Sequence, residues 1–90
     1  MKDIQDRYIK SFDKKLNEID NGLINRNFEI LRAMGHKLHG SGASYGFAKI
    51  TEIGKTINSL AKEKKLDDIN KQVSILKEYI TDLKKQRGII

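Results

Sequence analysis

Residues 32–46 read RAMGHKLHGSGASYG, a stretch that contains both histidines of the 90-residue chain and four of its seven glycines. A glycine inside a helix costs about 1 kcal/mol relative to alanine, yet the sequence on both sides has helical periodicity. We therefore expect these glycines to serve a purpose. The segment is predicted to present a solvent-exposed, reactive histidine to a partner protein.

A helical wheel predicts where this histidine points. At about 100° per residue, one group of residues falls within about 60° of a single direction, which defines the buried face. That group is Ile24, Phe28, Leu31, Met34, Gly35, Leu38, Gly42 and Tyr45. His36 lies roughly 140° from the same direction and should face solvent. Its helical neighbours are small or basic, namely Arg32, Ala33, His39, Gly40 and Ala43. Small neighbours leave room for another protein, and basic ones favour an anionic ligand.

Composition indicates one small helical domain that spans residues 1–90. The chain has no proline, which favours uninterrupted helices, and no cysteine, which excludes disulfides and thiolate metal sites. Its net charge of +6 suggests an anionic partner. No apolar run approaches the ~20 residues that span a bilayer, and the N-terminus lacks the apolar region of a signal peptide. We therefore expect a soluble cytoplasmic protein without membrane insertion.

The first half of the chain predicts two amphipathic helices. The first spans residues 2–20, and its apolar stripe is Ile4, Tyr8, Phe12, Leu16 and Ile19. The turn Asp20-Asn21-Gly22 should end it, with Gly22 just beyond the helix. Asn25 or Asn27 should cap the second helix, which should end between residues 42 and 46.

The second half predicts two more helices. Ser44 is the expected N-cap of the third, whose stripe is Phe47, Ile50, Ile53, Ile57 and Leu60. Gly54 lies beside this stripe and should let two helices approach closely. Asp67 or Asp68 should cap the fourth helix, whose stripe is Ile69, Val73, Leu76, Ile80 and Leu83. The tail KKQRGII is expected to fray.

Four amphipathic helices with short connections predict an all-α fold, an antiparallel up-down-up-down four-helix bundle. The structural alternative is a three-helix domain to which the first helix is loosely attached. No strand, internal repeat or glycine-rich phosphate loop is predicted, so the sequence offers no ATP site.

The residues from His36 to Ala43, followed by Tyr45 and Gly46, resemble the signature of histidine phosphotransfer domains. That signature reads approximately histidine, any residue, leucine, lysine, glycine and two small residues, before a small or apolar stretch that ends in glycine. The resemblance is close over residues 24–61 and extends to the whole chain in length and helix number. It implies a four-helix bundle in a two-component phosphorelay.

On this resemblance His36 is the phosphoacceptor, and Gly40 leaves room for docking. Arg32, Ala33, Lys37 and Ala43 would surround it and contact the partner. The implied partners are response-regulator receiver domains, with a hybrid sensor kinase as a further candidate. The resemblance implies no cofactor of the chain's own, since the receiver would bring the divalent metal, such as Mg²⁺. The domain would carry phosphoryl groups between receivers and would not be an enzyme.

One position departs from the family pattern, because His39 stands where the family usually has lysine. A lysine stays charged at all relevant pH values, whereas a histidine is charged only part of the time. His39 would therefore support the phosphoryl group only while it is charged. We expect transfer, or the lifetime of the phosphohistidine, to depend on pH more steeply than in a His39→Lys variant.

Three other functions fit parts of the sequence. His36 and His39 share a helix side, but two ligands do not make a closed zinc site, so no metal site is predicted. The positive charge permits nucleic-acid binding, but the basic residues are spread over all four predicted helices and form no recognition helix. A structural adaptor that has kept the fold without the chemistry is the third alternative.

Overall fold

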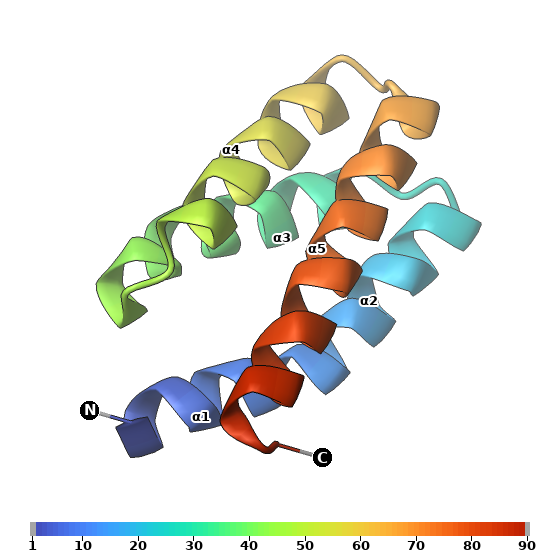
Figure 1. Ribbon diagram of the computed structural model, residues 1–90. Coiled ribbons are helices and arrows are strands. Elements are labelled where there is room, and N and C mark those ends of the chain that lie inside the picture. The colour runs from blue at the N-terminus through green and yellow to red at the C-terminus, as the bar shows by residue number, and fades with distance from the viewer. Residues whose placement is uncertain (1, 90) are drawn as a thin grey trace.

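The computed structural model describes residues 2–89, which form a helical bundle (Figure 1). Its helices are α1 (Lys2–Lys10), α2 (Phe12–Ile24), α3 (Phe28–Ser41), α4 (Ala48–Lys62) and α5 (Leu66–Arg87), and the 3₁₀ turn η1 (Ala43–Tyr45) follows α3. No strand occurs within these residues, so the predicted all-α class is confirmed. None of these helices is long and apolar enough to cross a membrane.

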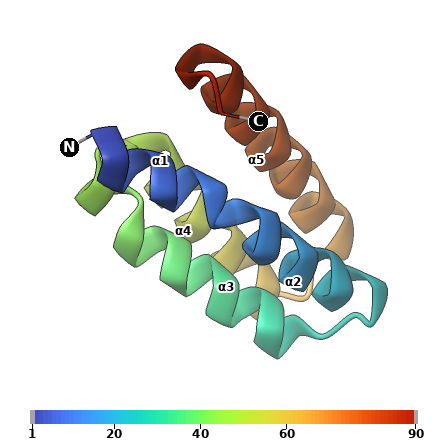
Figure 2. The ribbon, with the colours of Figure 1, turned by 90° about the horizontal axis from the view of Figure 1, so that it is seen from below.

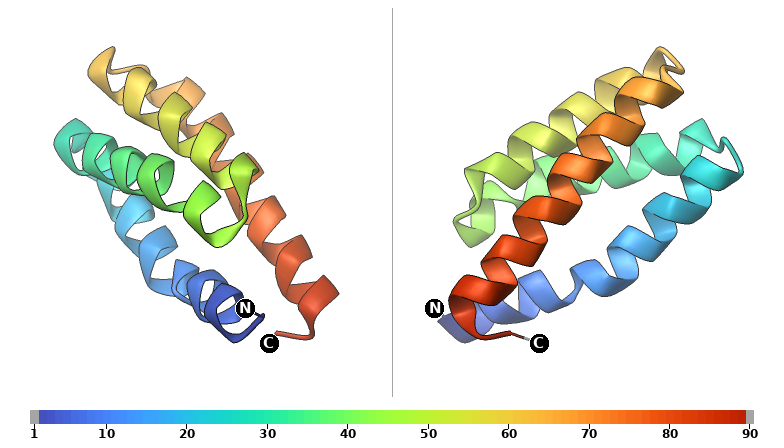
Figure 3. Two further views of the ribbon diagram at one scale, coloured as in Figure 1. Left: turned by 90° about the vertical axis from the view of Figure 1, so that its left-hand side faces the viewer. Right: turned by 45° about the vertical axis from the view of Figure 1, so that its right-hand side comes forward.

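Helices α1 and α2 follow one another as a single bent rod, so the described chain forms four rods (Figures 1 and 3). The sequence predicted one uninterrupted helix here. The interruption is at Ser11, whose backbone remains helical at φ −63° and ψ −16°. Its hydroxyl donates a hydrogen bond back to the carbonyl of Tyr8. Such serine back-bonding competes with the backbone ladder and bends helices, which explains the break.

The predicted apolar stripes supply most of the core. Their buried members are Tyr8, Phe12, Ile19, Leu31, Met34, Leu38, Phe47, Ile50, Ile53, Ile57, Ile69, Val73, Leu76, Ile80 and Leu83. Ile4 is an exception and is exposed, while Leu16, Phe28 and Leu60 are only partly buried. Ile24 and Tyr45 were wrongly assigned to the buried face of the second helix. Both lie outside α3, and they are 77% and 37% exposed.

The connection between α2 and α3 differs from the predicted turn. Gly22 does not end the helix but lies buried inside α2, which continues to Ile24. A Cβ atom on Gly22 would lie 3.1 Å from the Leu31 side chain, so this glycine lets α2 approach α3. Arg26 takes the left-handed conformation of the turn instead, at φ 50°. The predicted Asn27 cap is confirmed, because its Oδ1 accepts a hydrogen bond from the Ile30 N–H at 3.2 Å.

The connection between α3 and α4 is a tight turn through η1. The predicted Ser44 cap is wrong, because Ser44 lies within η1 and Phe47 occupies the N-cap position without a side-chain bond. Gly46 adopts a left-handed φ of 91°. The Thr51 hydroxyl accepts a hydrogen bond from the Ala43 N–H at 2.7 Å, which ties the turn to α4.

Two predictions about α5 are also corrected. Lys65, and neither Asp67 nor Asp68, occupies its N-cap position, although both aspartates lie in the first turn, where negative charge is favourable. The tail does not fray at residues 84–87, because α5 continues through Arg87. Gly88 ends it at φ 67°, and the Ile89 N–H donates to the Lys84 carbonyl at 2.8 Å. Ile90, the last residue of the tail, lies outside the described residues.

Contacts define the relative direction of two pairs of rods. Gly35 lies against Asn58, and Gly42 lies against Thr51, so positions rise along α3 as they fall along α4. Ion pairs join α5 to the first rod, and positions again fall along one as they rise along the other; Figure 2 shows the paths of these two rods. These pairs are Asp20–Lys77, Asp13–Lys84 and Asp6–Arg87. An exposed pair such as Asp20–Lys77 contributes at most about 1 kcal/mol, whereas both partners of Asp6–Arg87 are partly buried.

Tyr8 joins α1 to the end of α3, because its hydroxyl oxygen lies 2.7 Å from that of Ser41. Burial raises the pKa of Tyr8 above its ordinary value of 10.0. This effect is larger than that of the Ser41 hydrogen bond, which lowers the pKa. A raised pKa means that stability is fully present below about pH 10 and falls as pH rises further, because the unfolded chain loses its proton first.

Tyr8→Phe is therefore expected to cost about 1 kcal/mol near neutral pH but to make the decline of stability above about pH 10 shallower. Urea unfolding across this pH range measures both effects. Some decline should persist, because burial also raises the pKa of Tyr79. Parallel declines in wild type and variant would contradict the prediction.

Candidate functional site

Helix α3 holds His36 on its outward side. The preceding residue, Gly35, is buried against the backbone of α4, and Met34 and Leu38 enter the core. Because these neighbours face inward, His36 is left exposed to solvent, as the wheel predicted. The His36 ring makes no hydrogen bond with other residues in the range 2–89. No hydrogen bond of its own therefore holds the ring, and the helix backbone sets where the side chain leaves α3.

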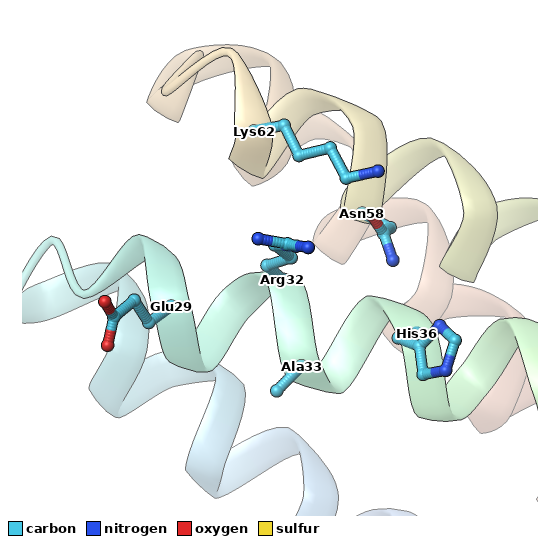
Figure 4. A pocket seen from close by; sticks show the side chains of 6 residues that line it. All are labelled: Glu29, Arg32, Ala33, His36, Asn58 and Lys62. Atoms are coloured by element: carbon cyan, nitrogen blue, oxygen red, sulfur yellow. The ribbon is translucent and has the colours of Figure 1, made fainter.

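An open groove of about 550 Å³ runs beside His36 between α3 and α4 (Figure 4). Side chains from both helices line it, namely Glu29, Arg32, Ala33, His36, Asn58 and Lys62. The ring of His36 lies at one end of the groove, and the amide of Asn58 points toward it from α4. The Arg32 head group reaches into the groove from α3, and the Lys62 side chain extends from α4 toward Asn58, whereas the Glu29 carboxylate points away from both.

The structure brings some of the predicted site residues together and leaves others apart. Arg32, Ala33 and His36 line the groove. The remaining predicted residues, His39, Gly40, Lys37 and Ala43, are exposed but do not line it. A Cβ atom on Gly40 would meet nothing within 4 Å outside its own helix backbone. The surface one turn beyond His36 is therefore bare backbone.

Lys37 lies on the opposite side of His36 from the groove, toward α2. Burial lowers the pKa of Lys15 on α2, the charge of Glu18 raises it, and the charge of Lys37 lowers it again. That electrostatic effect requires Lys37 to be close to Lys15. His36 thus has basic side chains on both sides, Arg32 and Lys62 in the groove and Lys37 toward α2.

The sequence reasoning missed the α4 side of the groove. Asn58 and Lys62 are one helical turn apart, and each directly follows a core residue, Ile57 or Ala61. This spacing places both on the edge of the buried face. The signal was therefore present in the sequence, but the register between α3 and α4 was needed to bring these residues to His36.

The groove holds few groups that suit a metal ion. No cluster of three or more histidine, cysteine, aspartate or glutamate side chains gathers anywhere in the described part of the chain. Among residues 2–89, Glu29 is the only carboxylate that lines the groove, and it faces away from the histidine. Arg32 and Lys62 form no ion pair with residues 2–89, so the groove carries uncompensated positive charge.

The chain was compared with known families, curated proteins and solved structures. The family described as the Hpt domain matches residues 3–86. No curated protein and no solved structure matches the chain. The match covers nearly the whole sequence and agrees with the helical bundle and the exposed histidine on α3. The chain therefore belongs to the Hpt domain family, the phosphotransfer domains of two-component phosphorelays.

Proposed function

We propose that His36 accepts a phosphoryl group from the aspartyl phosphate of a response-regulator receiver domain and passes it to another receiver. The observation that supports this most directly is the exposure of His36 beside the bare backbone at Gly40. A receiver must bring its phosphorylated aspartate to within bonding distance of the imidazole. A side chain at Gly40 would stand in the path of that approach.

Phosphoryl transfer to His36 requires few chemical groups from the bundle itself. A neutral ring nitrogen of His36 attacks phosphorus, the bond between phosphorus and the aspartyl oxygen breaks, and its electron pair leaves with the carboxylate. The other ring nitrogen keeps its proton. Catalysis of phosphoryl transfer depends mainly on positioning and charge neutralisation. A helix holds the nucleophile more rigidly than a loop would.

The rest of the proposal follows from this role. Residues 1–90 act as one domain, and the opposite directions of α3 and α4, and of α5 and the first rod, support an up-down-up-down antiparallel bundle.

The domain is a carrier and has no cofactor of its own, so the receiver supplies the divalent metal. Its partners are receiver domains and, as a further candidate, a hybrid sensor kinase, all acting in the cytoplasm. His39 and Gly40 border the phosphoryl group, while Arg32, Ala33, Lys37 and Ala43 contact the partner.

Transfer of labelled phosphate from a phosphorylated receiver tests the proposal. The labelled protein is digested under non-acidic conditions, and the modified residue is located by tandem mass spectrometry. We expect the phosphoryl group on His36. A protein that takes up no label, or that carries it on a residue other than His36, would overturn the proposal.

The histidine at position 39 predicts an unusual pH dependence. Histidine as a residue type changes charge between about pH 5 and 8, whereas lysine stays charged throughout. The ratio of the wild-type transfer rate to that of His39→Lys is therefore expected to fall by roughly twofold or more from about pH 5 to pH 8, because the ionisation of His36 affects both proteins alike. Superimposable pH profiles would show that position 39 does not act through its charge.

A further inference from the structure

A second open pocket, of about 360 Å³, lies where the first rod meets the turn η1. Side chains of α1, α2, the break between them and η1 line it, namely Ile4, Arg7, Tyr8, Ser11, Lys15 and Tyr45. The rings of Tyr8 and Tyr45 are stacked, with their centres 4.2 Å apart. The pocket therefore combines apolar and aromatic walls with two basic side chains, which suits an anion that carries a small apolar group.

The amine of Lys15 is held in place at this pocket. Its Nζ donates a hydrogen bond to the Ser11 hydroxyl, which in turn donates to the Tyr8 carbonyl. The same nitrogen lies 4.9 Å from the centre of the Tyr8 ring and 5.0 Å from that of the Phe12 ring. These contacts restrict a flexible side chain, so much of its ordering entropy is already lost in the folded protein. A nucleophile that is positioned in advance reacts faster than one that must first be ordered.

The surroundings of Lys15 also favour its neutral, nucleophilic form. Burial lowers the pKa of the amine, the charge of Glu18 on the same helix raises it, and the charge of Lys37 on α3 lowers it, with a net downward direction. From α1, Arg7 brings a further positive charge to the pocket. The charged groups that α5 brings to α2 are in ion pairs, namely Asp20–Lys77 and Asp13–Lys84. Near pH 8, Lys15 therefore has a larger neutral fraction than an ordinary lysine.

We propose that Lys15 is an acylation site that reacts with small acyl phosphates. The neutral amine attacks the acyl carbon, the bond between that carbon and the phosphate oxygen breaks, and its electron pair leaves with inorganic phosphate. The nitrogen gives up one proton to solvent, and an uncharged amide remains. Arg7 attracts the anionic donor, and the apolar wall formed by Ile4 and Tyr45 accommodates its acyl group. This reaction uses neither His36 nor a receiver, so it stands apart from the proposed phosphoryl transfer.

The test incubates the whole protein with acetyl phosphate at pH 8 and low salt. Mass spectrometry of the digested protein follows the initial acetylation rate at each lysine, and the exposed Lys71 of α5 is the reference within the same molecule. Lys15 should be acetylated at least about threefold faster than Lys71, because its amine is positioned and more often neutral. This preference should shrink as the pH rises toward about 10, where ordinary lysines also become neutral.

Two variants and a second donor test the class of donor. Arg7→Gln should slow the acetylation of Lys15 by acetyl phosphate about twofold or more, because the anion is attracted less strongly. The uncharged donor p-nitrophenyl acetate should acetylate Lys15 in this variant nearly as fast as in wild type. Lys10→Gln is the matched control, since Lys10 is exposed one turn further along α1, and it should leave both reactions close to those of wild type.

The outcomes decide the site and its donor separately. Acetylation of Lys15 that is no faster than that of Lys71 with either donor would overturn the acylation site. A preference for Lys15 that Arg7→Gln and Lys10→Gln reduce alike, or that only the uncharged donor shows, would refute acyl phosphates as its substrates. Neither result bears on the role of His36, because the assay contains no receiver. Failure of phosphoryl uptake at His36 would likewise leave the expected acetylation of Lys15 unchanged.

Discussion

His36→Gln is expected to abolish phosphoryl uptake from a receiver while it leaves the fold unchanged. Glutamine is similar in size and polarity but has no nucleophilic ring nitrogen, so uptake should fall by at least about 10³-fold, to background. Because His36 is exposed, the free energy of unfolding should change by less than about 0.5 kcal/mol. Transfer of radiolabelled phosphate measures the first effect, and urea unfolding measures the second.

His39→Gln is the matched control for this loss. The two histidines are one turn apart on α3, both are exposed, and both substitutions remove one imidazole. Uptake should remain within about tenfold of wild type, since charge effects from an exposed group are modest. Loss of uptake in His39→Gln but not in His36→Gln would move the phosphoacceptor to position 39. Equal uptake in both variants would mean that either histidine can serve.

The sequence was a good guide to the buried faces and to the direction of His36. Helical periodicity depends only on local geometry, and the stripe of α5 from Ile69 to Leu83 is buried as predicted. The wheel also placed His36 outward correctly, because Gly35 and Leu38 fix the orientation of α3. Local pattern therefore predicted which residues are available for chemistry.

Helix ends and contacts between helices were harder to predict. Gly22 has the composition of a helix stop, but its conformation depends on the approach of Leu31 from α3, which the local sequence does not contain. Ser44 and Asp67 are good capping residue types, yet neither occupies a cap position in the structure. The residues that α4 contributes to the groove depend on the register between two helices, and that register is a tertiary property.

That register is set by glycines, and replacing one of them should have the largest effect on stability. A Cβ atom on Gly54 would lie 2.5 Å from the backbone nitrogen of His39 and 2.6 Å from the Cβ of Leu38. Both atoms are held in place by the backbone of α3, so they cannot move unless α3 moves. Gly54→Ala must therefore push α4 and α3 apart. Overpacking of this kind costs about 3 kcal/mol, while the better helix propensity of alanine returns about 1 kcal/mol.

Gly54→Ala is therefore expected to destabilise the protein by about 2 kcal/mol, which lowers Tm by roughly 10 °C in a domain of this size. Thermal and urea unfolding measure both quantities. A stability equal to that of the wild type would show that α3 and α4 do not depend on close contact at this glycine.

Gly40→Ala is the matched substitution with the opposite expected sign. The added methyl group meets no neighbouring element, so only helix propensity acts, and stability should rise by about 0.5–1 kcal/mol. The same methyl group would stand on the surface where the receiver is proposed to dock, so transfer to His36 should become slower. A variant that is more stable and transfers as fast as wild type would remove docking as the reason for Gly40. A variant that is more stable but transfers more slowly would mean that Gly40 lowers the stability of the fold in exchange for the space that the receiver needs.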